Sequence, residues 1–188
     1  IQASADLAFH GLPSPGKENT KKGSGFEVPG VHPERKLVEV LGAGDQDWEK
    51  MRKWGFTAAH LAPSEGILRG TGPFVLLSDE ETNEIIIRNE VAQIMAFDPV
   101  GKNSSPSVYP SSLMGTLSVI RQSILDTNYA IQRIHYENKN QPQTTVDLHL
   151  GIQALSRSTS GKKNIPIWIE PGSCLMNAKA MEIAREFS

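Results

Sequence analysis

The side chains best suited to catalysis or metal binding are one histidine and two carboxylates, His60, Asp98 and Glu170. They lie in predicted strands or at the ends of predicted strands. Glu170 closes the stretch NIPIWIE, whose alternating apolar side chains predict a buried strand, and a Pro-Gly pair breaks the chain directly after it. In α/β proteins the carboxyl end of a strand is the usual place for a functional side chain. One hypothesis is that the three side chains bind one divalent ion, which requires them to converge at about 2.0 to 2.2 Å from a zinc ion.

Two of these residues also have a structural interpretation. A lone histidine inside a strand, such as His60, is more often a hydrogen-bonded core residue, and Asp98 suits a turn at a strand end. No pair among the five histidines has the short spacing that zinc sites use; the other four are His10, His32, His135 and His149. The sequence also has no GxSxG elbow and no phosphate loop. The residues alone therefore predict no complete catalytic set.

A second candidate is the stretch RGTG at 69–72. Glycine lets a backbone approach a ligand closely, so Arg69, Gly70 and Gly72 are candidate substrate-binding residues. A turn explains the same stretch equally well. Glu65 and Arg69 are four residues apart, which favours an exposed ion pair.

Composition and charge exclude several classes of protein. The 188 residues contain 19 Lys and Arg against 21 Asp and Glu, a formal charge of -2, without a basic block for phosphate backbones, so nucleic acid is not an expected partner. No apolar run approaches the roughly 18 residues of a membrane span, and no signal segment opens the chain. Cys174 is the only cysteine, which excludes an internal disulfide and a cysteine metal cluster. The start at Ile1 and the end at Ser188, directly after a predicted helix, suggest a piece of a longer protein.

The elements that must position these residues follow an α/β pattern. We expect residues 1–35 to be an irregular, loop-rich segment, apart from ADLAF, and 36–188 to form an α/β domain. The stretch DWEKMRKW predicts a helix that ends at Gly55, and FTAAHLAP a strand at 56–63. The runs FVLL and EIIIR, with a third run ending at Phe97, predict a small antiparallel insertion.

The second half of the chain is mainly helical. Apolar side chains recur at helical spacing on one stripe and predict a long helix: Leu113, Leu117, Ile120, Ile124, Ile131 and Ile134. A second helix is predicted within 141–159, capped near Thr144 or Thr145. The strand NIPIWIE is followed at once by a last helix, and the residues predicted for its inner face are Met176, Ala180, Ile183, Ala184 and Phe187.

Three stretches together resemble imidazolonepropionase-like members of the amidohydrolase superfamily, in particular a bacterial exported branch. They are WGFTAAHLAPSEGILRGTGPFVLLSD, YPSSLMGTLSVIRQSILDTNYA and IPIWIEPGSCLMNAKAMEIAREF, and the resemblance spans roughly 36–188. It implies a TIM-like (β/α) barrel of the metal-dependent hydrolase type, here partial, because a complete barrel needs about 250 residues. It also implies a periplasmic or secreted parent that uses a divalent metal such as zinc to hydrolyse C–N bonds in small amides, cyclic amides or peptides.

The departures from the family pattern concern the metal ligands. Where the family's first strand carries His-x-His, this chain has Leu7 and Phe9. Where a later strand carries two histidines, this chain has Glu170 and Gly172. A carboxylate can bind a divalent ion, whereas leucine and phenylalanine cannot. We therefore expect this segment to supply fold and pocket walls without binding a metal, as in the silent half of a tandem protein.

Two further expectations concern partners. The alternative from another class is a non-catalytic binding or assembly module, in which RGTG and the long first loop face a ligand or a second subunit. An open barrel exposes strand edges and apolar faces, which soluble proteins normally avoid. We therefore expect the chain to self-associate or to pair with the rest of the barrel.

Overall fold

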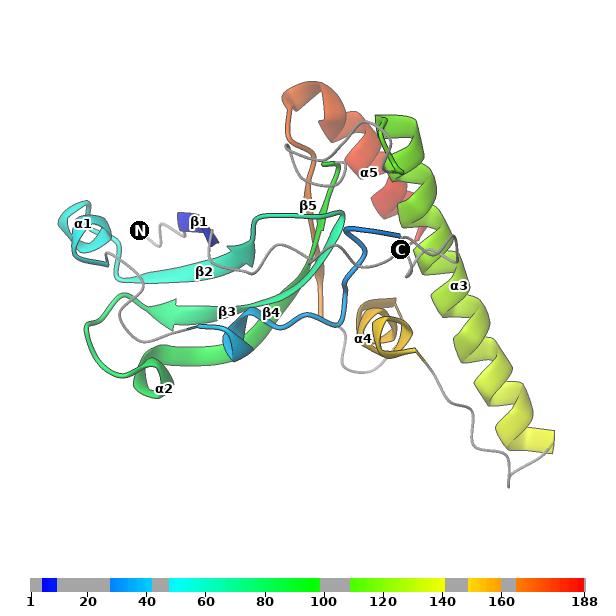
Figure 1. Ribbon diagram of the computed structural model, residues 1–188, viewed down its shortest axis with the longest axis horizontal. Coiled ribbons are helices and arrows are strands. Elements are labelled where there is room, and N and C mark those ends of the chain that lie inside the picture. Colours follow the sequence, from blue (N-terminus) through cyan, green and yellow to red (C-terminus); the bar gives the residue numbers. More distant parts are fainter. Residues whose placement is uncertain are drawn as a thin grey trace.

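The computed structural model describes residues 5–9, 28–41, 48–98, 109–140, 149–159 and 165–187, with only the backbone of 5–9. The chain has a mixed α/β fold (Figure 1). Its strands are β1 (Ala5–Phe9), β2 (Ala58–Pro63), β3 (Leu68–Leu76), β4 (Ile86–Ala96) and β5 (Ile167–Glu170). Its helices are η2 (Leu37–Glu39), α1 (Trp48–Lys53), α2 (Thr82–Ile85), α3 (Leu113–Asn140), α4 (Leu150–Thr159), η3 (Cys174–Met176) and α5 (Asn177–Glu186), where η marks a 3-10 helix.

The strands form one curled sheet, in the order β1-β2-β3-β4-β5 (Figure 1). The outer pairs β1·β2 and β4·β5 are parallel, whereas β3 is antiparallel to both of its neighbours. Four strands therefore run in one direction, and their carboxyl ends meet at the edge of the sheet where β3 begins. We call this edge the strand-end edge.

The predicted antiparallel pair is present as β3 and β4, and it lies in the middle of the sheet because β2 and β5 pair with its outer sides. The expected division of 84–97 into two strands is wrong, since β4 runs without a break from Ile86 to Ala96. The strand predicted at 56–63 is confirmed as β2, and NIPIWIE is confirmed as β5, which ends at Glu170.

Parts of the range 1–35 also contact the sheet. The backbone of β1 pairs with β2 over its whole length. Val31 is fully buried and forms an isolated bridge with Leu68. The prediction that this range is loop-rich applies mainly to residues 10–27, which lie outside the described part.

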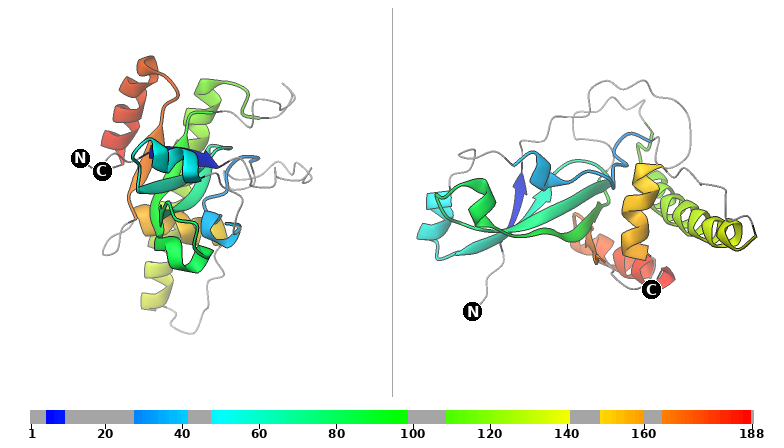
Figure 2. Two further views of the ribbon diagram at one scale, coloured as in Figure 1. Left: turned by 90° about the vertical axis from the view of Figure 1, so that its left-hand side faces the viewer. Right: turned by 90° about the horizontal axis from the view of Figure 1, so that it is seen from below.

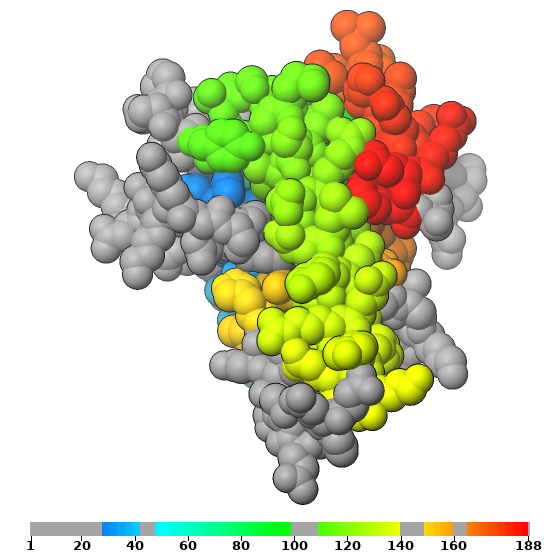
Figure 3. All heavy atoms as spheres, turned by 90° about the vertical axis from the view of Figure 1, so that its right-hand side faces the viewer, coloured from blue at the N-terminus to red at the C-terminus, as the bar shows by residue number. Residues whose placement is uncertain are grey.

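Helices gather at both ends of the sheet, with α1 and α2 at one end and α3, α4 and α5 at the other (Figure 2). A smaller apolar cluster packs η2 and α1 on β2 and β3, with Leu37, Trp48, Leu61 and Val75 among its members. A larger cluster packs the three long helices on the sheet, with Leu68, Met95, Ile120, Leu155 and Ile183 among its members. Figure 3 shows α3 along this end of the molecule, between α4 and α5.

The helical stripe predicted along 113–134 is confirmed in α3, where Leu117, Ile120 and Ile124 are buried. Ile131 and Ile134 are only partly buried, because α3 continues beyond the sheet (Figure 1). In α5, Ile183 is buried as predicted and Ala180 and Phe187 are partly buried, but Ala184 is exposed, contrary to the prediction. The described part of α4 begins at Leu150, and its predicted cap lies outside the described residues. Among the helices that the structure describes, none is long and apolar enough to cross a membrane.

Candidate functional site

The strand-end edge brings Asp98 and Glu170 close together. β4 ends at Ala96, whose register partner on β5 is Glu170. The backbone N–H of Phe97 donates to the carbonyl of Glu170 at 3.1 Å, so the two chains stay adjacent beyond the strand ends. Asp98 follows directly. Both carboxylates therefore lie at the edge where a barrel-like fold places functional residues.

The two carboxylates meet at the guanidinium of Arg69. Its Nη1 donates to Glu170 Oε2 at 2.7 Å, and its Nη2 donates to Asp98 Oδ2 at 3.0 Å. Its Nε donates to the carbonyl of Gly66 at 3.0 Å, and Nη1 also donates to the carbonyl of Pro63 at 3.1 Å. The Arg69 side chain is only 4% exposed. We call Arg69, Asp98 and Glu170 the Arg69 cluster.

The predicted exposed ion pair of Arg69 with Glu65 is wrong, because Arg69 is the extra residue of a β-bulge. Leu68 pairs with Met95 and Gly70 pairs with Ile94, so two steps along β3 match one step along β4. A bulge redirects the side chain of its extra residue. Here the side chain lies in the buried edge of the sheet rather than on the surface.

The two glycines of RGTG serve the fold in a specific way. Gly70 has φ +91°, and a Cβ at this position would lie 2.1 Å from the carbonyl oxygen of Arg35. A Cβ on Gly72 would lie 1.7 Å from the carbonyl oxygen of Leu61. RGTG is therefore part of strand β3 and not a turn, and its glycines admit neighbouring backbone of the same chain. The substrate-binding role of Arg69, Gly70 and Gly72 stays a prediction.

His60 lies apart from this arrangement, in the middle of β2. It is buried, its centroid is 5.9 Å from that of the Trp168 ring, and the two ring planes are inclined by 44°. In the described part of the chain, no three His, Cys, Asp or Glu side chains form a group that could hold a metal. His60, Asp98 and Glu170 therefore do not show the convergence that the one-ion hypothesis requires.

The arrangement of charged side chains at the strand-end edge does not suit a divalent ion. An arginine stays protonated at all pH values relevant to proteins, so a fixed positive charge lies within hydrogen-bond distance of both carboxylates. An incoming cation would have to displace that charge. The edge is instead a salt-bridged network with one cation and two anions, and its two acids remain in contact with solvent, since their side chains are 54% exposed for Asp98 and 29% for Glu170.

All three members of the Arg69 cluster were named as candidates from the sequence, but their contacts with one another were not predicted. The partners of Arg69 lie 29 and 101 residues away along the chain. A usable signal was present in β3, because a glycine inside a strand pattern, here Gly70, often marks a bulge.

Comparisons with known proteins agree with this architecture. No family model matches the sequence, and no curated protein matches it. Among solved structures, the crystal structure of an amidohydrolase from Thermotoga maritima is similar, with 21% sequence identity and a TM-score of 0.72. The similarity covers 84% of this chain and 41% of that chain, so this chain spans less than half of the length of its neighbour. The chain therefore has an amidohydrolase-like fold.

Proposed function

We propose that this chain is part of a TIM-like (β/α) barrel of the metal-dependent hydrolase type, from the imidazolonepropionase-like, bacterial exported branch. The parent hydrolyses C–N bonds in amides, cyclic amides or peptides, in the periplasm or outside the cell. This part supplies scaffold and pocket walls. The structural neighbour and the curled sheet with four strands in one direction support the barrel.

The observation that carries the scaffold role is the buried guanidinium of Arg69 between Asp98 and Glu170. Barrels of this type build their sites at the carboxyl ends of strands. Metal-assisted hydrolysis requires ligands that hold an ion beside a bound water. At this edge a permanent cation uses both carboxylates instead, so the hydrolytic site belongs to another part of the parent protein.

Pairing with another part of a barrel is supported by the edges of the sheet. In the described residues, β1 and β5 are the two edge strands, and both run in the common direction. An edge strand leaves N–H and C=O groups unpaired on its outer side. Further parallel strands, from the rest of the barrel or from a second copy, satisfy these groups and cover the half-exposed Trp168 of β5.

The experiment that tests this function measures metal content and hydrolysis together. The purified chain and its Glu170→Ala variant are analysed by plasma mass spectrometry, and both are assayed against a panel of amides, cyclic amides and dipeptides. We expect no stoichiometric metal and no hydrolysis in either protein. Metal-dependent hydrolysis by the chain alone would contradict the scaffold role.

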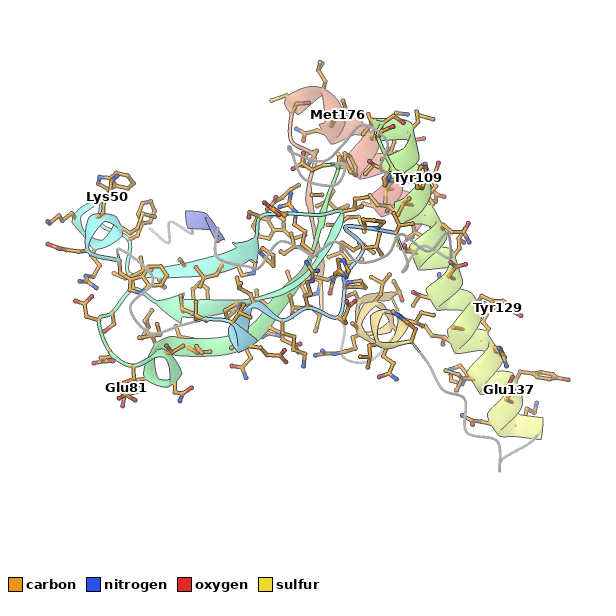
Figure 4. All side chains as sticks on the ribbon, viewed as in Figure 1. Lys50, Glu81, Tyr109, Tyr129, Glu137 and Met176 are labelled. Carbon is orange, nitrogen blue, oxygen red and sulfur yellow. The ribbon has the colours of Figure 1, made fainter. Side chains whose placement is uncertain are left out.

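A second candidate function is a non-catalytic assembly module, which an exposed apolar stripe on α3 favours. Met114, Leu125 and Tyr129 are all exposed, and their spacing of eleven and four residues places them on one face of the helix. Tyr129 lies on the part of α3 that extends beyond the sheet (Figure 4). Light scattering after size exclusion tests this role. If α3 mediates assembly, a Leu125→Gln, Tyr129→Ser double variant forms assemblies of lower molar mass than the unmodified chain does.

A further inference from the structure

We propose that the guanidinium of Arg69 is a built-in cation of the strand-end edge, which holds Asp98 and Glu170 together and thereby excludes divalent metal. The inference deepens the proposed function and rests on it in one respect, that the edge belongs to a hydrolase barrel. The inference names Arg69 as the residue that takes the place of a metal ion in this part of the barrel.

The first support is the coordination of the guanidinium. Two carboxylate oxygens and two carbonyl oxygens lie 2.7 to 3.1 Å from its nitrogens. These contacts use four of its five N–H donors. Oxygen atoms of carboxylates and backbone carbonyls are also the ligands that hard divalent ions take in proteins. The guanidinium thus has the kind of oxygen environment that such an ion would need.

The second support is the balance of charge. A buried charge is tolerated when it is paired and hydrogen-bonded, and Arg69 meets both conditions. Without a cation between them, Asp98 and Glu170 would repel each other at the same edge.

The third support is that Arg69 is not free to move aside. Its Nε and Nη1 are tied to the carbonyls of Gly66 and Pro63, between the end of β2 and the start of β3. The bulge and the φ of +91° at Gly70 fix the backbone that carries the side chain. A metal ion would therefore have to break hydrogen bonds to the backbone as well as two ion pairs.

The test compares thermal unfolding and bound metal in matched variants. Arg69→Met removes the charge but keeps a long side chain, and Arg69→Lys keeps the charge without the planar fork. Arg52→Met is the control, because Arg52 on α1 also binds a carboxylate through two nitrogens, that of Asp79, and donates to the carbonyl of Leu77 at 3.1 Å. Each protein is stripped with EDTA and then measured with and without ZnCl₂ or MnCl₂, and bound metal is determined after dialysis.

We expect the unmodified chain to bind no metal and to show the same midpoint in EDTA and in ZnCl₂. Arg69→Met should unfold about 10 °C lower, because a buried ion pair loses one partner, whereas Arg52→Met should change by about 2 °C or less. A divalent ion should then raise the midpoint of Arg69→Met by several degrees. The same ion should leave the Arg69→Met, Glu170→Gln double variant unchanged, since one of the two carboxylates is missing.

Three results would overturn the inference. They are stoichiometric metal in the unmodified chain that is lost in Glu170→Ala, an Arg69→Met midpoint no lower than that of Arg52→Met, and no response of Arg69→Met to either ion. If Arg69→Met does not fold, Arg69→Lys is the deciding variant. We expect its unfolding midpoint to be lower than that of the unmodified chain, and we expect it to bind no metal. Bound metal in Arg69→Lys would contradict the inference. Metal-dependent hydrolysis that persists in Glu170→Ala would contradict the scaffold function alone, because its ion would be bound elsewhere.

Discussion

Two charged clusters of this molecule have central charges of opposite sign. In the Arg69 cluster one buried cation lies between two carboxylates. In a second cluster, which we call the Glu90 cluster, the Glu90 carboxylate on β4 accepts two hydrogen bonds from Arg157 of α4, one of them at 3.0 Å. Lys36 approaches the same carboxylate at 3.6 Å, and Thr71 of β3 donates to it at 3.4 Å. One anion therefore has two cations around it.

The two clusters follow the same arrangement of burial. In each cluster the side chain that carries the central charge is less exposed than its partners: Arg69 is 4% and Glu90 16% exposed, whereas the partner side chains are 29% to 54% exposed. The clusters differ in what they join. The Arg69 cluster joins the carboxyl ends of β4 and β5 to the start of β3, whereas the Glu90 cluster joins α4 and the residue before η2 to the sheet. Of the two clusters, only the Arg69 cluster places two carboxylates around one cation, as a metal site would, so only its central cation occupies the place of a metal ion.

The largest effect should come from removing the central cation. Arg69→Met leaves two carboxylates facing each other and leaves the buried carbonyls of Gly66 and Pro63 without their donor, so we expect the free energy of unfolding to fall by about 3 to 5 kcal/mol. Urea denaturation followed by circular dichroism measures this loss. A loss no larger than that of the control Arg52→Met would contradict the predicted importance of the buried cation.

Removal of the central anion should cost less. Glu90→Gln loses the charge that binds Arg157 and Lys36, but both cations are more than two-fifths exposed and can be hydrated again. We expect a loss of about 1 to 3 kcal/mol in urea denaturation. The amide hydrogens of α4 should also exchange faster, since α4 loses its ion pair with β4. An unchanged exchange rate would mean that apolar packing alone holds α4.

The pH dependence should separate the clusters further. The hydrogen bonds from Arg157 lower the pKa of Glu90 below its ordinary value of 4.5, so the folded chain favours the ionised form. The resulting stabilisation is complete above pH 4.5 and is lost as the pH falls through the pKa of the folded state. In urea titrations from pH 7 downward, the difference between the unmodified chain and Glu90→Gln should therefore shrink below pH 4.5. A constant difference would contradict an ionic role of Glu90.

Within the Arg69 cluster, the two acids should contribute unequally. Glu170→Gln removes the shorter contact to Arg69, at 2.7 Å, from the less exposed side chain, so we expect a loss of about 1 to 2 kcal/mol. Asp98→Asn removes a contact at 3.0 Å from a side chain that is 54% exposed, and its loss should stay below about 1 kcal/mol. The reverse order in urea denaturation would mean that Asp98 is the principal partner of Arg69.

The sequence by itself determined the features that depend on near neighbours. The apolar stripe of α3, the end of α1 before Gly55 with its φ of +91°, and the strand that ends at Glu170 all follow from patterns within a few turns of chain. These features were predictable because each helix or strand must bury one apolar face, and because glycine or proline residues near its end favour its termination.

Only the tertiary structure decided which of the candidate residues meet. The bulge at Arg69 depends on how β3 pairs with β4, and it directs a side chain that local spacing assigned to the surface into the buried edge. Glu170 reaches Arg69 across 101 residues because β5 joins the sheet beside β4, whereas His60 in the middle of β2 lies beside Trp168 instead. Contacts of this kind depend on strand order and register, which no local pattern encodes.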